Sequence, residues 1–452
     1  MTLKPYPKYK DSGVESLGDV PHHWQTKPLK FMASINDEVL TENVDPDYDL
    51  NYVDIGSVSL TSGIEKIETF NFKDAPSRAR RIVRHGDIIV STVRTYLKAI
   101  APINNPPDNL IVSTGFAVVR AGQDLSSRFA SFLLQSTGFV DEIISRSTGV
   151  SYPAINATDL ARIKIPRPPS PEQSAIATFL DHETGKIDAL IAEQEKLITL
   201  LAEKRQATIS HAVTKGLNPD VRMKDSCVEW LGEVPEGWEV KRLKFLIVSI
   251  ESGTSVNSAD IPAIAEEFGI LKTSCVYDGE FRASENKTVL IEEYKRVNCP
   301  VKINHLIVSR MNTPDLVGAI GLVREEYKNI FLPDRLWQIG LLSKMPAFVH
   351  FWSRTRIYRS QVEMVCTGAS SSMQNLSQGQ FGDFIISYPS DTIEQQLIID
   401  FLDQETTKLD SLTAEANRVI DLLKERRTAL ISAAVTGKID VRGVVQAEQV
   451  AA

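Results

Sequence analysis

The chain contains one helical stretch twice. Residues 171–216 read PEQSAIATFLDHETGKIDALIAEQEKLITLLAEKRQATISHAVTKG, and residues 393–438 read IEQQLIIDFLDQETTKLDSLTAEANRVIDLLKERRTALISAAVTGK. The two copies align without a gap, and more than half of the aligned residues are identical. A long internal repeat fixes the architecture before any local pattern is considered. The sequence therefore predicts two halves of similar construction.

Each copy is predicted to be helical. A hydroxyl residue precedes each copy and Gln follows three residues later, which is the spacing of a capping box. The pattern predicts a first short helix that ends near His182 or Gln404, and a second helix that begins after Thr184 or Thr406. At ~1.5 Å rise per residue, about 30 residues would form a rod of roughly 45 Å.

The second helix of each copy has apolar residues at alternating three- and four-residue steps. This heptad pattern is typical of helices that pack along their length, and the return of the chain favours an antiparallel pair. Arg205 and Arg427, like Glu203 and Glu425, are identical in the two copies, and either cross-helix pairs or subunit contacts would explain them. The predicted seam residues are Ile187, Leu190, Leu197 and Leu201 in the first copy and Leu409, Leu412, Val419 and Leu423 in the second.

The repetition extends beyond the helices. Lys10 opens KDSGVESLGDVPHHWQTKPLKF, and Lys224 opens KDSCVEWLGEVPEGWEVKRLKF. We expect a mixed α+β fold with two similar globular domains, joined by two long helices packed as an antiparallel coiled coil with a pseudo-twofold repeat. The expected division is two globular domains at 1–170 and 218–392, two helical regions at 171–217 and 393–440, and a tail at 441–452.

Composition limits the class of protein. The chain has 452 residues, of which 42% are hydrophobic, and this is typical of a globular protein. No run approaches the ~18 apolar residues of a membrane span, the N-terminus does not resemble a signal peptide, and the four scattered cysteines suit a reducing cytoplasm. A net charge of −8 argues mildly against a protein that holds nucleic acid without local basic patches or partners.

Motifs for catalysis are weak. No two glycines are separated by a single residue, so G-x-G cofactor loops are absent, and so is a G-K-[ST] phosphate loop. Residues 105–108 read NPPD, which resembles a methyltransferase tetrapeptide but has Asp108 where an aromatic residue would stack on a flipped base. Asp315, Glu326 and Lys328 match a loose metal-dependent nuclease pattern that is common by chance. No histidine or cysteine spacing predicts a metal site.

Basic clusters and two similar loops are better candidates. Arginine donates paired hydrogen bonds to phosphate oxygens and guanine edges, although a solvated face or an internal ion pair would explain any one of them equally well. Thr-Gly followed by small polar residues occurs before each helical repeat. The candidate DNA-contacting residues are Arg78, Arg80, Arg81, Arg84, Arg94, Lys98, Thr148, Ser151, Tyr152, Arg310, Arg335, Arg354, Arg356, Ser370 and Ser371.

These features together resemble a known family. The phrase VTKGLNPDVRMKDS from Val213, the motif VExLGxVPxxW, and the pattern EQ…FLD…T…ID…E.R…I…VT.G are similar to the specificity subunit of a type I restriction–modification enzyme. The resemblance covers nearly the whole chain, and the globular interiors contribute least to it. The Thr-Gly loops resemble family loops beside the DNA.

The resemblance implies a cytoplasmic, non-catalytic subunit of a bacterial defence system. Each globular domain would read one half of a bipartite double-stranded DNA sequence, and the coiled coil would set the spacer. It would also dock two methyltransferase (modification) subunits for adenine methylation, and restriction subunits would join that core. No cofactor is expected on this chain, because S-adenosylmethionine, ATP and magnesium would bind partner subunits. A self-contained nuclease or methyltransferase, and a scaffold that does not bind DNA, are the alternatives.

Overall fold

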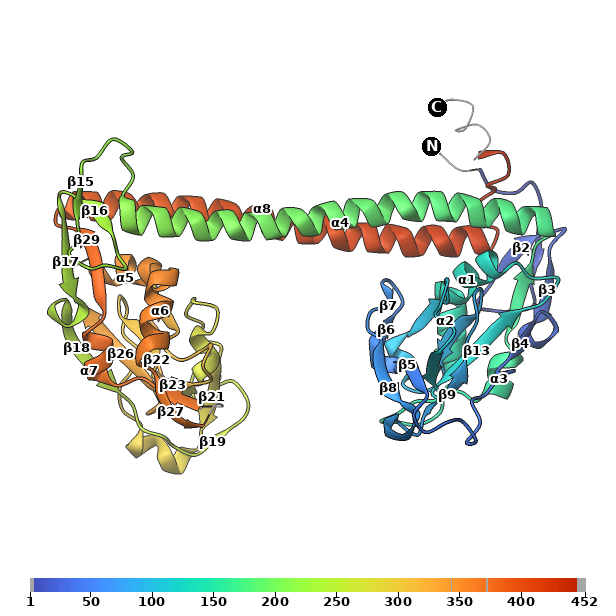
Figure 1. Ribbon diagram of the computed structural model, residues 1–452, viewed down its shortest axis with the longest axis horizontal. Coiled ribbons are helices and arrows are strands. Elements are labelled where there is room, and N and C mark those ends of the chain that lie inside the picture. Colours follow the sequence, from blue (N-terminus) through green and yellow to red (C-terminus); the bar gives the residue numbers. More distant parts are fainter. Residues whose placement is uncertain (1–3, 343, 371–372, 445–452) are drawn as a thin grey trace. The chain divides into compact units, whose positions relative to one another are not determined.

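The computed structural model describes residues 4–342, 344–370 and 373–444. The chain divides into two compact units, one built from 1–195 and 416–452 and the other from 196–415. Each unit contains a globular part together with half of each of two long helices, α4 (Ser170–Lys215) and α8 (Thr392–Val435) (Figure 1). The predicted mixed α+β class with two long helices is confirmed.

Unit 1 contains two four-stranded sheets, ordered β11-β10-β13-β4 and β8-β5-β12-β9. Residues of β10 alternate between the two sides of their sheet, because successive strand side chains point to opposite faces. Ile88 and Val90 pack towards helices α1 and α2, whereas Ile89 packs towards the second sheet. Its elements are β1 (Tyr9–Asp11), β2 (Asp19–Pro21), β3 (Gln25–Pro28), β4 (Ala33–Ile35), β5 (Asp49–Val53), β6 (Val58–Ser59), β7 (Gly63–Ile64), β8 (Glu68–Asn71), β9 (Ala79–Ile82), β10 (Ile88–Ser91), β11 (Ile100–Pro102), β12 (Leu110–Ser113), β13 (Phe116–Ala121), α1 (Ser127–Gln135), α2 (Thr137–Arg146), α3 (Ala157–Ala161) and β14 (Lys164–Arg167).

Unit 2 repeats this plan with sheets ordered β18-β26-β22-β24 and β19-β21-β20-β25. Strand β22 alternates as β10 does: Leu306 and Val308 face the helices, and Ile307 faces the other sheet. Its elements are β15 (Met223–Asp225), β16 (Glu233–Pro235), β17 (Trp238–Arg242), β18 (Ile247–Ser252), β19 (Ser258–Ala259), β20 (Gly269–Leu271), β21 (Asn286–Val289), β22 (Leu306–Ser309), β23 (Met311–Asn312), β24 (Ile320–Leu322), β25 (Ile330–Phe331), β26 (Leu336–Leu341), α5 (Met345–Ser353), α6 (Arg356–Val365), β27 (Thr367–Ser370), β28 (Met373–Asn375), α7 (Gln378–Gly382) and β29 (Ile385–Pro389).

The long helices are continuous, so the predicted break near His182 and Gln404 is wrong. Thr184 and Thr406 are buried, and each hydroxyl donates to the carbonyl one turn earlier, Leu180 O at 2.6 Å and Leu402 O at 2.7 Å. These local bonds satisfy the hydroxyls inside the helix. With 46 residues, α4 is about 69 Å long at 1.5 Å per residue, longer than the predicted rod.

The repeated Gln does not close a capping box, as its spacing had suggested. Gln173 is buried, accepts from Ser126 N at 2.8 Å and donates to the carbonyls of Asp124 and Pro168 at 3.0 Å. Gln395 likewise donates to Pro389 O at 2.7 Å. The repeated Gln therefore fixes the start of each helix to the chain segments that precede it.

The buried stripe of the long helices keeps the predicted heptad period but uses partly different residues. Ile187, Leu201 and Leu409 are buried, whereas Leu190, Leu197 and Leu412 expose 47%, 42% and 42% of their surface, so their assignment to the seam is wrong. From Ile187, a heptad pattern can step by three residues and then four, or by four residues and then three. The two orders mark different stripes on the helix, and packing decides which stripe is buried. The buried or half-buried positions are Ile187, Ile191, Gln194, Ile198 and Leu201 in α4 and the equivalent Leu409, Thr413, Ala416, Ile420 and Leu423 in α8, with Val419 half-buried beside them.

Two equivalent ion pairs join the long helices, which run in opposite directions where they pair in each unit (Figure 1). In unit 1, Arg427 Nε lies 2.9 Å from Asp188 Oδ1. In unit 2, Arg205 Nε lies 3.2 Å from Asp410 Oδ1. The four residues occupy equivalent positions of the repeat. Cross-helix pairing, one of the two explanations that the sequence left open for the arginines, is therefore present in both units.

Candidate nucleic-acid interface

One exposed surface of unit 1 brings several candidate residues together. Arg94 follows β10, Lys98 follows the 3₁₀ helix Thr95–Leu97, and loop 148–154 lies beside them. Antiparallel bridges of Ala154 with both Val93 and Thr148 hold the loop in place. We call the surface formed by Arg94, Tyr96, Lys98 and residues 148–152 the unit 1 tip.

The tip presents aromatic and basic groups to solvent. The Arg94 guanidinium lies 5.1 Å from the centre of the Tyr152 ring, a cation–π contact that orients both side chains. Tyr152 exposes 64% of its surface and Tyr96 exposes 53%. An exposed Arg beside two exposed rings can donate to phosphate oxygens or base edges and stack on sugars or bases. Sequence reasoning missed Tyr96, although an aromatic between Arg94 and Lys98 was a usable signal.

Hydrogen bonds connect the segments that form the unit 1 tip. Thr95 Oγ1 lies 2.9 Å from Ser147 Oγ, which links the 3₁₀ helix to the beginning of the loop. Backbone hydrogen bonds of 2.9 Å run both ways between Thr148 and Ala154 and close the loop. Gly149 has φ +109° and little space beside the carbonyl of Tyr152, so a side chain would strain this turn. Thr148 and Ser151 are exposed on the closed loop.

The arginine cluster at 78–84 does not form one surface. Arg78 is exposed, but Arg80 lies 4.9 Å from the centre of the Phe72 ring. Arg81 is half-buried, its Nε has no hydrogen-bond partner among the residues that the structure describes, and burial lowers its pKa. Alternation along β9 sends successive side chains to opposite faces and so separates residues that are neighbours in sequence.

Arg84 also has an internal partner. Its guanidinium donates to Glu38 at 2.7 Å, and hydrogen bonds from Arg120 and Arg84 hold the pKa of Glu38 below its usual value. Arg120 in turn pairs with the buried Asp87 at 2.8 Å. Arg84 is therefore part of an ion-pair network on the sheet, apart from the tip.

Unit 2 has a corresponding surface where β22 ends. Arg310 N donates to Arg335 O at 3.1 Å, and Arg310 Nε donates to Asp334 O at 2.7 Å. Met311 pairs with Asn375 of β28, and β28 pairs on its other side with β27, which begins at Thr367, so the second Thr-Gly loop belongs to the same small sheet as the strand after Arg310. Ser370 ends β27, and the structure does not describe its side chain, whereas Ser371 lies outside the described residues.

The other two candidate arginines of unit 2 lie on α6 or just before it. Arg354 contacts Glu280 and accepts a hydrogen bond on its carbonyl from Gln206 of α4 at 2.7 Å, and burial lowers its pKa. Arg356 is exposed and lies 3.3 Å from Glu363. The contacts of Arg354 therefore tie it to the long helix instead of to the Arg310 surface.

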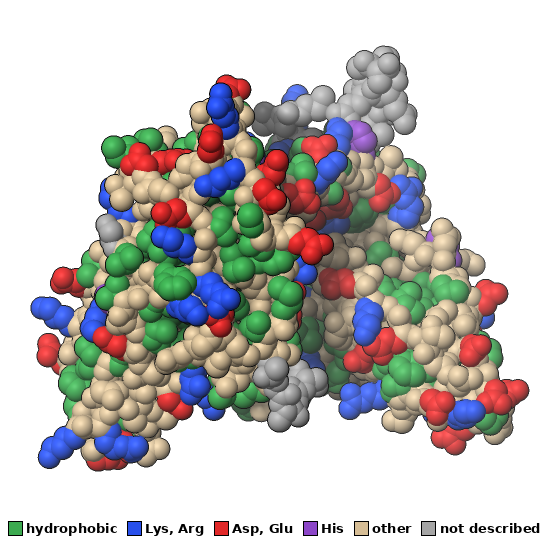
Figure 2. Space-filling model, turned by 60° about the vertical axis from the view of Figure 1, so that its left-hand side comes forward, with side chains coloured by type: hydrophobic (Ala, Val, Ile, Leu, Met, Phe, Trp, Pro, Cys, Tyr) green, Lys and Arg blue, Asp and Glu red, His purple; other side chains and the backbone are tan. Residues whose placement is uncertain are grey.

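The molecular surface carries charges of both signs. Figure 2 shows Lys and Arg side chains interspersed with Asp and Glu over the face drawn. Among the described residues, no group of three or more His, Cys, Asp or Glu could hold a metal ion. Within the same part of the chain, no helix is long and apolar enough to cross a membrane.

Comparisons with known proteins give one consistent family. Residues 21–200 match the type I restriction modification DNA specificity domain. The chain is 22% identical over 329 residues to the type I restriction enzyme EcoKI specificity subunit of Escherichia coli (strain K12), covering 71% of this chain and 68% of that one. It is 25% identical over 249 residues to the putative type I restriction enzyme MjaX specificity subunit of Methanocaldococcus jannaschii, covering 52% of this chain and 56% of that one.

A solved structure shares the fold. A chain from a study of complex assembly and conformational transition of the type I R-M system superposes with a TM-score of 0.69 at 20% identity. The match covers 93% of this chain and 99% of that chain, so it includes both globular parts and both long helices.

Proposed function

Because the chain belongs to the type I restriction–modification specificity family, we propose that its two units each read one half of a bipartite double-stranded DNA sequence. The observation that carries the proposal is the repeated placement of a Thr-Gly loop beside a basic residue at the end of β10 and of β22. The two units thus carry different side chains on a similar scaffold: Arg94 contacts Tyr152 in one, and in the other the half-buried Arg310 donates to the carbonyl of Asp334, next to the exposed Arg335. Different side chains on one scaffold suit two half-sites of different sequence.

Catalysis would belong to other chains. In the proposed complex this subunit is non-catalytic, two modification subunits use S-adenosylmethionine to methylate an adenine in each half-site, and restriction subunits supply ATP- and magnesium-dependent cleavage. The repeat supports a pair of identical partners, because it offers the same surface twice. Leu190 and Leu200 of α4 expose 47% and 50% of their surface, and the equivalent Leu412 and Leu422 of α8 expose 42% and 55%. The proposal assigns these matched leucines to the two docking surfaces.

The long helices are proposed to set the length of the unread gap. Both run without interruption from one unit into the other, so a change in helix length acts on the chain between the two reading surfaces. A matched insertion of one heptad in each helix, at Glu195 of α4 and at the equivalent Asn417 of α8, would preserve the buried stripe. The proposal predicts that this insertion lengthens the gap and leaves both half-sites unchanged.

The decisive experiment is to co-express the chain with its modification subunit and map methylated adenines across the host genome. We expect a split motif with an unread gap. The double variant Arg94→Ala/Tyr152→Ala should weaken recognition of one half-site by ~1–3 kcal/mol for each lost base contact and leave the other half unchanged. Arg84→Gln, on the ion-pair network away from the tip, is the matched control.

The outcomes separate the proposal from its rivals. A contiguous motif, or equal loss of both half-sites in the tip variant, would refute the assignment of one half-site to each unit. Metal-dependent cleavage by the purified chain, abolished by Asp315→Ala, would instead support a nuclease. A complex that assembles but does not bind DNA would support the scaffold.

A further inference from the structure

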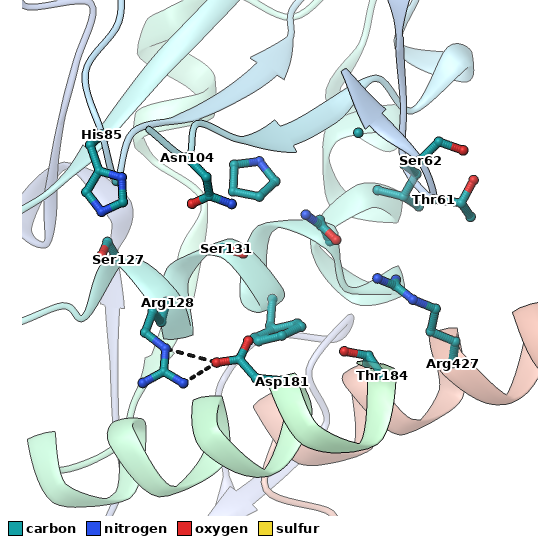
Figure 3. Close-up of a pocket in the computed structure, with 16 residues that line it drawn as sticks. Thr61, Ser62, His85, Asn104, Ser127, Arg128, Ser131, Asp181, Thr184 and Arg427 are labelled. Carbon is teal, nitrogen blue, oxygen red and sulfur yellow. Dashed lines mark hydrogen bonds and ion pairs between the residues drawn. The ribbon is translucent and has the colours of Figure 1, made fainter. Parts of the chain in front are cut away.

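Unit 1 contains two polar pockets of similar volume, and they differ in how their arginines are paired. The first, of about 500 Å³, lies beside the long helices (Figure 3). There Arg128 pairs with Asp181, and Arg427 pairs with Asp188, so both arginines are bound within the chain. The second pocket, of about 510 Å³, lies on the sheet β8-β5-β12-β9. Its arginine, Arg78, makes no side-chain hydrogen bond or ion pair to any residue that the structure describes.

Three neighbouring strands place the charged residues of the second pocket at one edge of this sheet. β5 runs parallel to β12, so Asp54, which follows β5, lies at the edge where β12 also ends. β9 runs antiparallel to β12 and begins at the same edge, and Arg78, which precedes β9, accepts a hydrogen bond on its carbonyl from Thr114 N at 2.8 Å. The backbones of Asp54 and Arg78 are therefore two strand spacings apart, about 10 Å.

The second pocket combines a hydrogen-bond acceptor with a hydrogen-bond donor. Asp54 is exposed, and its Oδ1 accepts from Tyr52 Oη at 3.1 Å, while no described residue donates to its Oδ2. The Arg78 guanidinium is exposed as well, and the hydroxyl groups of Ser57 and Ser77 lie in the same lining. A ligand of this pocket can therefore donate to Asp54 and accept from Arg78 at the same time.

The second pocket adjoins the unit 1 tip through a single turn. Residues 113–115 join β12 to β13, and Gly115 O accepts from both Thr92 N and Thr92 Oγ1 at 2.8 Å. The next residue, Val93, forms an antiparallel bridge with Ala154 of the tip loop. The pocket is therefore a neighbour of the surface that we assign to DNA.

Unit 2 carries the opposite charge at the equivalent place. β20 runs parallel to β25 as β5 runs parallel to β12, and a 3₁₀ helix follows β20 as one follows β5. The residue between strand and 3₁₀ helix is Asp54 in unit 1 and Lys272 in unit 2, and neither side chain caps its helix. Lys272 is half-buried and lies 3.7 Å from the exposed Asp260. A reversal of charge at one position of a shared scaffold suits two ligands that differ in hydrogen-bonding pattern.

We propose that Asp54 and Arg78 together read one G·C base pair of the half-site assigned to unit 1. In the major groove, guanine offers the acceptors O6 and N7, and its paired cytosine offers the N4 amino group as a donor. Arg78 supplies the donors for guanine, and Asp54 supplies the acceptor for cytosine. A phosphate group fits less well, because it offers acceptors only and the carboxylates of Asp54 and Glu68 in the pocket repel it. The proposal rests on the proposed function for DNA as the ligand.

The test is the selection of bound sequences from random duplexes by the purified full chain, alone and with the modification subunit. In the half-site that Arg94→Ala/Tyr152→Ala alters, we expect the wild-type chain to prefer one G·C pair roughly tenfold or more over other base pairs. Asp54→Asn and Arg78→Gln should each reduce this preference to less than about threefold at that pair and at no other, because an amide both donates and accepts. Asp108→Asn is the matched control, because Asp108 is exposed and precedes β12 at the opposite edge of the sheet.

Three results would overturn the proposal. Changes at two different base pairs in Asp54→Asn and Arg78→Gln would show that the residues do not share a pair. An equal loss of affinity for all duplexes in Arg78→Gln, with a salt-dependence slope smaller by about 1, would place Arg78 on a phosphate. An unchanged preference in both variants would show that neither residue reads a base.

Unit 2 supplies an internal check. Lys272 can only donate, so Lys272→Gln should relax the preference for one guanine in the other half-site and leave the G·C pair read by unit 1 unchanged. Failure of the proposed function gives a different result. A wild-type chain that selects no split sequence, alone or with the modification subunit, refutes that function and this assignment together. A split sequence that Asp54→Asn and Arg78→Gln leave unchanged refutes the assignment alone.

Discussion

Glu172, near the start of α4, joins the repeated helix to the N-terminal motif of unit 1. Its side chain is 10% exposed. Glu172 Oε2 accepts from Trp24 Nε1 at 2.8 Å and from Tyr6 Oη at 3.2 Å, while His23 Nε2 lies 2.6 Å from Oε1. In unit 2 the equivalent Glu394 is half-buried and accepts from Trp238 Nε1 at 2.9 Å. The repeat thus supplies a matched control for substitutions of Glu172.

Glu172→Gln should destabilise unit 1 substantially. The amide oxygen can still accept from Trp24 and Tyr6 while the NH₂ donates to His23 Nε2, provided that His23 carries its proton on Nδ1. The bonds from Trp24 and Tyr6 then lose the negative charge of their acceptor, at ~1 kcal/mol each, so we expect a loss of about 2 kcal/mol in the free energy of unfolding. Glu394→Gln should cost about 0.5 kcal/mol, because its amide oxygen can still accept from Trp238.

Hydrogen exchange of the full chain, resolved by peptide, is the suitable assay. The two units need not unfold together, so a single melting temperature would not assign the loss. We expect faster exchange in β2, β3 and β10 of unit 1 and little change in unit 2. Trp24→Phe should cost less in the Glu172→Gln background than in the wild-type chain, because the two residues share one hydrogen bond. Equal losses for Glu172→Gln and Glu394→Gln, or a loss below ~0.5 kcal/mol for Glu172→Gln, would refute this reasoning.

Two further predictions concern the helix stripe and a buried histidine. Leu201→Ala should lower the free energy of unfolding by ~2–3 kcal/mol, and the exposed Leu197→Ala by less than ~1 kcal/mol, in urea titrations followed by circular dichroism; equal losses would contradict the observed stripe. Burial lowers the pKa of His350 to about 4, so the folded state keeps it neutral while the unfolded chain binds a proton below the ordinary value of 6.5. Stability of unit 2 should therefore be complete above pH 6.5 and fall as the pH drops towards 4, by at most ~1.4 kcal/mol per pH unit, and His350→Gln should remove this dependence in α5 hydrogen exchange.

Local patterns predicted the long helices well and their contacts less well. The heptad period was visible in the sequence, but Leu190 and Leu197 were assigned to the seam in place of Ile191 and Ile198. A sequence of leucines and isoleucines fits two adjacent stripes nearly equally. Only the position of the facing helix selects one of them, because burial depends on the partner surface.

The candidate DNA contacts show the same difference between what local patterns predict and what packing decides. Proximity in sequence grouped Arg80, Arg81 and Arg84, yet strand alternation and the partners Phe72 and Glu38 separate them. Residues distant in sequence, Arg94 and Tyr152, lie in contact because two β-bridges bring their segments together. The position of a residue along a strand determines to which face of the sheet its side chain points. It does not identify the chain segment that packs against that face.

The sequence by itself determined the twofold repeat, the mixed α+β class, the long antiparallel helices and the resemblance to type I specificity subunits, because all of these follow from patterns written along the chain. The tertiary structure alone decided which stripe of each helix is buried, which arginines remain available, and that Asp54 and Arg78 line one pocket. These depend on distances between residues far apart in sequence, which are set by how the packed elements fill space.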